Sequence, residues 1–581
     1  MDRSSLILAF ATFALFFANA EFNEIAYFHP LRIILLNLLG LAAAVAFFIA
    51  YAQRGKEIRL SRRTGIVMAA SLALFFALSF QLVGIAMLIS VGALLVEAFS
   101  SKRLSGYRFY AVSITVIIIA FLLSYSMLYP LRGTNWKGVD EIAYNYYASY
   151  LLLHGTNPYT VSMFPIIKAH NITPTYLLNG SVETAYDYPA FSFLPVLFLG
   201  SFNLGNFISF IGIVVLVTII VTFIIYKKIS YKAAALLPIA AWLLVTYAFM
   251  GTIDHYISVA LFLLLAYTER ESPIISGIFM GLSASTIQLS WFALPFLFVL
   301  MYRENGKNSV LKAICIAVLT FLVVNSYFIA ASPKLFIENI FGLFGTSGLL
   351  VSGTNIMQVL IRSYGVALWY PAVLSLLAFA VLITLFYLYT YTLKPLLAIA
   401  PAFIFMLSWH NFLMYSLPYV PLIILLCYEK ESRLEDAIRS KSYILVALAA
   451  LVAISAMLAA YSHYVYAKSD TISVNGASIP FYVNANNTYG FNGIALSVAN
   501  NGNSYENVSF FFITEQNRKD GIFQSIYMNG MQPHSTKTYT LNYSVQSLTG
   551  NTRIYVMAFS RDYITGAEFR IDAQSGNVTR T

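Results

Sequence analysis

The chain has 581 residues, of which 59% are hydrophobic and only 10% are charged, with a formal net charge of +10. Soluble domains carry about 25% charged residues, so this composition excludes an ordinary soluble enzyme, a disordered chain and a disulfide scaffold. It is typical of a polytopic helical membrane protein. In such a chain the positions of the Lys and Arg residues indicate which segments face the cytoplasm. Their excess over acidic residues does not indicate a nucleic-acid partner.

Long apolar runs separated by basic connectors fill the first 461 residues. The runs lie at 5–20, 31–51, 64–82, 83–99, 109–129, 206–226, 233–250, 255–267, 274–302, 310–330, 367–391, 395–408, 411–428 and 442–461. If 274–302 is a helical hairpin that turns near Ser290 and Trp291, the chain makes about fifteen crossings and every basic connector lies on one side. Of the 27 Lys and Arg residues before residue 462, 21 then face the cytoplasm, which is the positive-inside pattern.

This topology predicts a multi-pass protein of the cell membrane, with its N-terminus inside and residues 130–187 and 462–581 outside. Arg3 and the apolar stretch after it, ending in Ala18-Asn19-Ala20, also fit a cleavable signal peptide. Segment 188–205 is apolar but contains two Pro and two Gly residues, so we expect a juxtamembrane or re-entrant helix there.

The tail 462–581 has a different pattern. Apolar and polar residues alternate near 494–498, 508–513 and 553–557, and Asn-Gly pairs occur at 475–476, 501–502 and 529–530. Alternation and Asn-Gly pairs predict strands and turns of an antiparallel β-sandwich. The tail resembles the immunoglobulin-like adhesion modules of archaeal and bacterial surface proteins. The chain is therefore divided into an N-terminal transmembrane module (1–108), a transmembrane core (109–461) and an extracytoplasmic β-domain (462–581).

The outer loop 130–187 contains a pair of adjacent carboxylates. Asp140 and Glu141 follow a crossing that ends outside, and a helix from Asp140 places Asp140, Tyr144 and Tyr147 on one face. The run Gly155-Thr156-Asn157-Pro158-Tyr159 ends that helix. An acidic pair at a helix start often only complements the helix dipole, and that role is the alternative to a functional site.

This stretch resembles the first outer loop of the GT-C superfamily, the polytopic glycosyltransferases that use polyprenyl-phosphate sugars. The resemblance covers residues 125–430 and continues in Asp187-Tyr188-Pro189, in Asp254 at the outer start of a crossing, and in 281–288, where relatives often have Lys and this chain has Gln288. The chain departs from the family at Ala190, where a second Pro is usual, and in its five crossings before Asp140. It also lacks the Trp-Trp-Asp signature of oligosaccharyltransferase catalytic subunits.

The resemblance implies a GT-C-like core at 109–461 and a mannosyltransferase-like activity. A sugar would pass with inversion from polyprenyl (dolichyl) phosphate to an acceptor hydroxyl on a glycan, lipid or protein. Asp140 is the expected base, with Glu141 beside it, and Arg362, with Lys334 as second choice, is expected to hold the departing phosphate. For both cations snorkelling to the interface is the alternative. The other expected substrate-binding residues are Tyr144, Asn157, Tyr159, Asp187, Asp254, Gln288 and His410.

Two other functions fit parts of the pattern. A transporter or flippase of lipid-linked saccharides also needs many crossings, although its ionisable groups usually lie near the bilayer midplane. A surface adhesion protein would use only the tail. No cluster of His, Cys and Asp has the spacing of metal ligands, so we predict no metal-ligating residues, while Asp140 and Glu141 remain ligand types that a divalent ion accepts.

Overall fold

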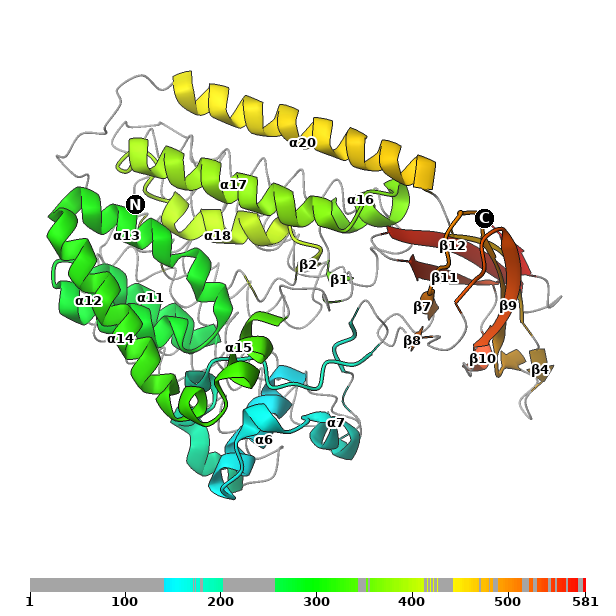
Figure 1. Ribbon diagram of the computed structural model, residues 1–581, viewed down its shortest axis with the longest axis horizontal. Coiled ribbons are helices and arrows are strands. Elements are labelled where there is room, and N and C mark those ends of the chain that lie inside the picture. The colour runs from blue at the N-terminus through cyan, green and yellow to red at the C-terminus, as the bar shows by residue number, and fades with distance from the viewer. Residues whose placement is uncertain are drawn as a thin grey trace, which may run out of the picture.

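The structure is a computed structural model in which four parts of the chain and most of the tail are described (Figure 1). The described residues are 140–201 without 171, 173 and 178–180, then 256–342, 349, 352–353, 356–411, 415, 418–419, 422, 426, 442–469, 472–479, 481–483, 489–514, 522–525, 530–541, 545–548, 551–560, 563–572 and 578–580. The predicted N-terminal module, the predicted crossings between 109 and 250, and Asp254 lie outside them.

The predicted helix over Asp140 and the residues that follow it is confirmed. It is α6 (Asp140–Leu153), and Gly155 follows it with a φ of 75°, a left-handed conformation that glycine adopts without strain. Asn157 then accepts a hydrogen bond from the backbone N–H of Tyr159 at 3.0 Å and begins the 3₁₀-helix η2 (Pro158–Thr160). A short helix α7 (Phe164–His170) completes this half of the loop.

The described part of segment 188–205 is helical, as expected, and the helices are of the 3₁₀ type. The described part of this segment forms two 3₁₀-helices, η3 (Ala190–Ser192) and η4 (Leu194–Ser201). Pro189 and Pro195 have no N–H to donate, which disfavours a continuous α-helix across the segment.

Ten further helices and 3₁₀-helices are described before the tail. They are α11 (Tyr256–Thr268), α12 (Pro273–Ala284), η6 (Gln288–Phe292), α13 (Leu294–Asn305), α14 (Lys307–Ala331), α15 (Pro333–Gly342), α16 (Ile356–Tyr364), α17 (Trp369–Leu388), α18 (Leu396–Met406) and α20 (Ser442–Ser469). The run 274–302 is interrupted by η6 at the predicted position. Gly306, with a φ of 80°, is the one residue between α13 and α14.

Three of these helices are long and apolar enough to cross a membrane: α14, α17 and residues 442–465 of α20. At about 1.5 Å per residue, the 25 residues of α14 extend beyond a hydrocarbon core of about 30 Å. Large apolar side chains such as Val323 on α14 and Leu445 on α20 are exposed, as lipid contact requires. The chain is therefore helical with membrane-length apolar segments, and the number of crossings stays a prediction.

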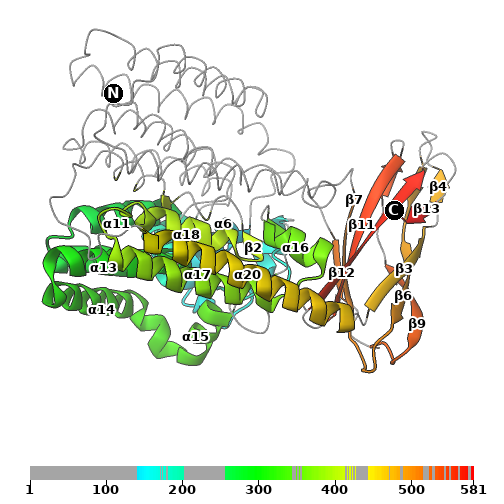
Figure 2. The same ribbon diagram turned by 90° about the horizontal axis from the view of Figure 1, so that it is seen from above.

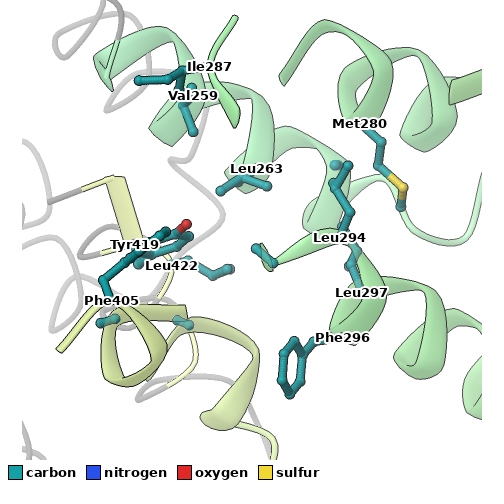
Figure 3. Packing of buried hydrophobic residues seen from close by; sticks show 14 of the residues in the cluster. Val259, Leu263, Met280, Ile287, Leu294, Phe296, Leu297, Phe405, Tyr419 and Leu422 are labelled. Atoms are coloured by element: carbon teal, nitrogen blue, oxygen red, sulfur yellow. The ribbon is translucent and has the colours of Figure 1, made fainter. Parts of the chain in front are cut away.

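Most of the helices pack around one core, part of which is shown in Figure 3, and a second buried cluster joins α16, α17 and α20. Leu294, Phe296 and Leu297 of α13 are buried in the first of these with Phe405 of α18 and Tyr419. The hydroxyl of Tyr419 donates to the carbonyl of Leu289 at 2.6 Å, which ties the later part of the chain to η6.

Helices α12 and α14 approach closely because α12 carries two glycines four residues apart. A Cβ atom at Gly281 would lie 2.5 Å from the carbonyl oxygen of Ala317, and one at Gly277 would lie 2.7 Å from that of Ala313. Small residues at this spacing are a common means of bringing membrane helices together.

At one end of the bundle, three predicted cytoplasmic connectors meet at Glu304. Its carboxylate pairs with Arg270 at 2.6 Å and with Lys394 at 3.4 Å, and both cations lie over the ring of Tyr267. The outer loop contacts the opposite ends of α12 and α14, through Ser285 and Asn325. This grouping agrees with the sidedness expected from the cation pattern, which itself stays a prediction.

The tail forms antiparallel sheets, shown in Figure 2 beside the helical part. The strands are β3 (Ile472–Ser478), β4 (Phe481–Val483), β5 (Tyr489–Phe491), β6 (Ile494–Asn500), β7 (Ser509–Thr514), β8 (Ile522–Ser525), β9 (Ser535–Leu541), β10 (Val545–Leu548), β11 (Asn551–Ser560), β12 (Tyr563–Asp572) and β13 (Val578–Arg580). Their orders are β13-β12-β11-β7-β8, β3-β6-β9 and β10-β5-β4. The three predicted strand segments are confirmed.

Alternate residues of the two larger tail sheets share one core. Leu496 and Val498 of β6 are buried with Phe510 of β7 and Val556 of β11. One expectation is corrected, because the Asn-Gly pair at 475–476 forms no turn. It lies inside β3, where the register with β6 shifts between Val474 and Gly476, and glycine suits such a bulge.

The tail is joined to the helical part at two places. Strand β12 packs against α16, as Figure 1 shows. Helix α20, which leads into β3, is hydrogen-bonded to the start of α17: Ser462 Oγ accepts from the N–H of Ala367 at 2.7 Å, and the Tyr370 hydroxyl lies 2.8 Å from Ser455 Oγ.

Candidate functional site

The carboxylate of Asp140 is buried, with 7% of the residue exposed, and fastens two parts of the outer loop together. Its Oδ1 accepts the N–H of Glu141 at 3.0 Å, and its Oδ2 accepts the N–H of Thr175 at 2.8 Å. Both oxygens therefore accept a hydrogen bond from the main chain, one from Glu141 in α6 and one from Thr175, which lies 35 residues after Asp140. Glu141 is buried as well.

A second carboxylate, Glu183, joins the site without any motif in the sequence to indicate it. The buried Tyr144 donates its hydroxyl to the carbonyl of Glu183 at 2.5 Å. The side chain of Glu183 accepts the N–H of Ala185 at 2.7 Å. The only available signal was its proximity to Asp187 in an otherwise apolar loop end, which is weak.

Asp187 is the third carboxylate, with 6% of the residue exposed. Its Oδ1 is out of contact with solvent and has no hydrogen-bond partner among the residues that the structure describes. Its carbonyl oxygen, in contrast, accepts Nε2 of Gln288 at 2.5 Å, and the same amide nitrogen lies 3.1 Å from the carbonyl of Ile340. The sequence-predicted residues Asp187 and Gln288 are thus in direct contact, through the main chain of Asp187.

The three carboxylates lie close enough to affect one another. Burial raises the pKa of Asp140, Glu183 and Asp187 above the usual range, and for Asp187 the negative charges of Glu183 and Asp140 raise the pKa further. Burial, followed by the charges of Asp140, Asp187 and Glu183, raises the pKa of the Tyr144 hydroxyl. Within the described part of the chain, none of the three acids has an ion pair with a cation.

The expected substrate-binding residues Tyr159 and Asn157 form part of the loop's framework. The buried Tyr159 donates its hydroxyl to the carbonyl of Tyr188 at 2.6 Å, and its own carbonyl accepts Nδ2 of Asn339 in α15 at 3.1 Å. Asn157 caps η2. Tyr159 also interacts electrostatically with Asp187, so it lies at the carboxylate group.

His410 reaches the same region from the other side. It lies in strand β2 (His410–Asn411), which pairs in parallel with β1 (Ser352–Gly353), and its ring centroid is 6.3 Å from that of Tyr415. Tyr415 in turn interacts electrostatically with Glu141, Asp140 and Asp187. The segments that meet here are thus α6, residues 175–187, η6, and the stretch around β2.

The two expected phosphate-binding cations are placed differently. Lys334 lies on α15 with its side chain 85% exposed and 3.8 Å from Glu338 one helical turn away, so it is a solvated charge. Arg362 lies in α16, and its side chain falls outside the described part of the structure, as does all of Asp254.

A metal centre is not formed by the described residues, which contain no group of three or more His, Cys, Asp or Glu side chains arranged to hold an ion. Comparison with family models, with curated proteins and with solved structures gives no match to this chain. The chemistry of the site must therefore be argued from its own residues.

Proposed function

We propose that the protein is a membrane glycosyltransferase that moves a sugar from a polyprenyl-phosphate donor to an acceptor hydroxyl at the outer face of the membrane. The observation that supports this most is the group of the buried Asp140 and Asp187 with the half-buried Glu183, three carboxylates gathered where the outer loop meets η6. Buried acids without ion-pairing cations carry an energetic cost, and groups with perturbed proton affinity concentrate at functional sites.

Sugar transfer from a lipid phosphate requires few catalytic groups, and a site with buried carboxylates supplies the most important of them. The phosphate oxygen leaves as an anion, so the main requirements are to orient an acceptor hydroxyl and to take its proton. Attack opposite the leaving group inverts the anomeric centre. A carboxylate whose pKa is raised toward neutrality is a stronger base than an exposed one, which suits it to this step.

The departing phosphate requires a cation or another hydrogen-bond donor. Arg362 is the candidate that we propose, because α16 begins three residues after β1, and β1 pairs with the His410 strand at the site. A guanidinium group binds phosphate oxygens in a bidentate manner. Lys334 is less suited, because its charge is solvated and paired with Glu338.

The proposal is tested with membranes that contain the full-length protein and a series of polyprenyl-phosphate sugars labelled in the sugar. We expect the label to enter a product with wild-type protein and not with a variant that carries both Asp140→Asn and Asp187→Asn. No labelled product with any donor, combined with movement of intact labelled lipid between leaflets, would support the transporter or flippase alternative instead.

A further inference from the structure

Among the acids of the candidate site, Asp140, Glu183 and Asp187 lie close enough to affect one another, and their surroundings differ in a way that separates their roles. Both carboxylate oxygens of Asp140 accept hydrogen bonds from main-chain N–H groups, those of Glu141 and Thr175. Glu183 uses Oε1 on the N–H of Ala185. Asp187 alone among these three has a buried carboxylate oxygen, Oδ1, without a hydrogen-bond partner in the described part of the structure.

The main chain around Asp187 is held in place from four other elements. Gln288 of η6 donates to its carbonyl at 2.5 Å, and Tyr159 of η2 donates to the carbonyl of Tyr188 at 2.6 Å. The hydroxyl of Tyr186 donates to Oδ1 of Asn145 in α6 at 2.6 Å. On the far side, Ala190 donates its N–H to Oδ1 of Asn325 in α14 at 2.9 Å.

This framework holds Oδ1 of Asp187 in a buried position without a hydrogen bond from the described residues, which is unfavourable in free energy. A buried acceptor without a partner costs about 1–3 kcal/mol, more if it is charged, and a position fixed from four directions cannot relax to find one. Such a cost is commonly kept where a ligand group supplies the missing hydrogen bond. The group that fits is a hydroxyl, which donates one proton to Oδ1 and still offers its own lone pairs for reaction.

We propose that Asp187 is the catalytic base of this site, taking the proton of the acceptor hydroxyl on Oδ1, while Asp140 is a positioning residue that holds residues 174–177 against α6. The assignment rests on the proposed function and departs from the sequence expectation, in which Asp140 is the base. In the step itself, the acceptor oxygen forms a bond to the anomeric carbon as the bond from that carbon to the phosphate oxygen breaks. The bonding pair leaves with polyprenyl phosphate, and the acceptor proton passes to Asp187.

Proton affinity points in the same direction. Burial raises the pKa of both Asp140 and Asp187. Hydrogen bonds to the charged carboxylate partly offset this for Asp140, whereas the charges of Glu183 and Asp140 raise the pKa of Asp187 further. The titratable groups that interact with Asp187 are those two acids and the tyrosines Tyr144, Tyr159 and Tyr415. Burial raises the pKa of Tyr144 and of Tyr159 further above 10, so neither ionises between pH 5 and 8.

Asp187→Asn is a clean test because the four fixing bonds use other atoms than the Asp187 carboxylate. Transfer by the full-length protein in membranes should fall by about 10²–10⁴-fold, the usual loss for a general base, with little change in KM for the donor. Glu338→Gln is the control, since it removes an exposed charge from α15, outside the carboxylate group. It should leave transfer close to the wild-type level.

Two further measurements distinguish a catalytic base from a residue that only positions the loop. Hydrogen exchange at the N–H of Thr175 should accelerate in Asp140→Asn and stay slow in Asp187→Asn. The wild-type rate should fall as the pH is lowered and Asp187 takes up a proton, and Asp140→Asn should keep that acid limb even where its rate is lower.

The outcomes can be told apart. Wild-type protein without transfer from any donor refutes the proposed function. Wild-type transfer with a fully active Asp187→Asn variant, or with a wild-type rate that does not fall as the pH is lowered, overturns the assignment of Asp187 and leaves the proposed function standing. The pH profile needs no variant, so a rate that stays constant as the pH falls overturns the assignment even if Asp187→Asn fails to fold.

Discussion

Replacing Gly281 by Ala should loosen the helical core and disturb the site at the same time. The new Cβ atom would lie 2.5 Å from the carbonyl oxygen of Ala317 and 2.5 Å from Cβ of Thr320, whereas ordinary contact begins at 3.4 Å. The first neighbour is main chain and the second is a branched carbon, so neither can turn aside. The added methyl group must push α12 and α14 apart by roughly 1 Å, against interior packing with no spare volume.

The size of the effect follows from two opposing contributions. Overpacking of this kind costs about 1–3 kcal/mol, and the main-chain contact favours the upper end of that range. Alanine recovers about 1 kcal/mol through its higher helix propensity. We therefore expect a net loss of about 2 kcal/mol in the free energy of unfolding.

The same displacement moves two contacts of the outer loop. Ser285, at the end of α12, accepts the N–H of Phe191 at 2.9 Å, and Gln288 follows it with its hydrogen bond to Asp187. Sugar transfer should fall together with stability. Trp291 is a convenient reporter, because its Nε1 donates to the carbonyl of Ala284 at 3.0 Å.

Thermal unfolding in detergent, followed by tryptophan emission, measures the effect. Gly342→Ala is the matched control: a Cβ atom there meets nothing within 4 Å, and its Tm should not fall. If Gly281→Ala unfolds at the wild-type temperature, α12 and α14 do not approach as closely as described, and the reasoning fails.

Three other predictions follow from the fold. Burial raises the pKa of Asp140, Glu183 and Asp187 above their unfolded values of 3.8 to 4.5. At a pH between the unfolded and the folded pKa of each acid, the folded state therefore binds more protons than the unfolded state. Stability should fall as pH rises, by up to about 1.4 kcal/mol per pH unit for each acid titrating; unfolding at pH 5 and pH 7.5 checks this, and a stability that rises with pH contradicts it. Glu304→Gln removes the anion beside the half-buried Arg270 and the buried Lys394, and it should cost about 3 kcal/mol, the lower end of the range for a broken buried pair. The exposed Glu338→Gln change should cost less than about 0.5 kcal/mol, and equal Tm values for the two variants would refute the difference. Residues 466–581 expressed alone should give a β-type circular-dichroism spectrum, and a helical or unfolded spectrum would show that the tail needs the helices.

The sequence predicted those features that depend on local pattern. The helix over Asp140 and the residues that follow it, its end before Gly155, the interruption of 274–302 and the main strands of the tail all follow from periodicity and from Gly and Pro positions. The position of Asn475-Gly476 inside β3 could not be predicted in this way, because the same pair serves a turn or a bulge depending on its partner strand.

The site was predictable in its members and not in their roles. Asp140, Asp187 and Gln288 were all expected, yet nothing in the pattern shows that Gln288 holds the main chain of Asp187, or that Thr175 occupies an oxygen of Asp140. Those contacts join residues 101 and 35 positions apart, and they depend on tertiary packing. Glu183 was missed for the same reason, since its neighbours in sequence carry no motif.

The contact between β12 and α16 means that the tail packs against a helix that lies about 200 residues earlier in the chain, so removing the tail also exposes part of the helical region. A truncation at residue 465 removes the sheet that packs on α16 and the last turn of α20, while it keeps Ser455 and Ser462, which contact the start of α17. The uncovered face belongs to the helix that carries Arg362, so a shortened protein could lose the proposed donor binding while residues 140–187 stay intact. A pull or a bound partner on the tail would likewise act on α16, which makes this strand and helix pair a natural place to attach a reporter of the site.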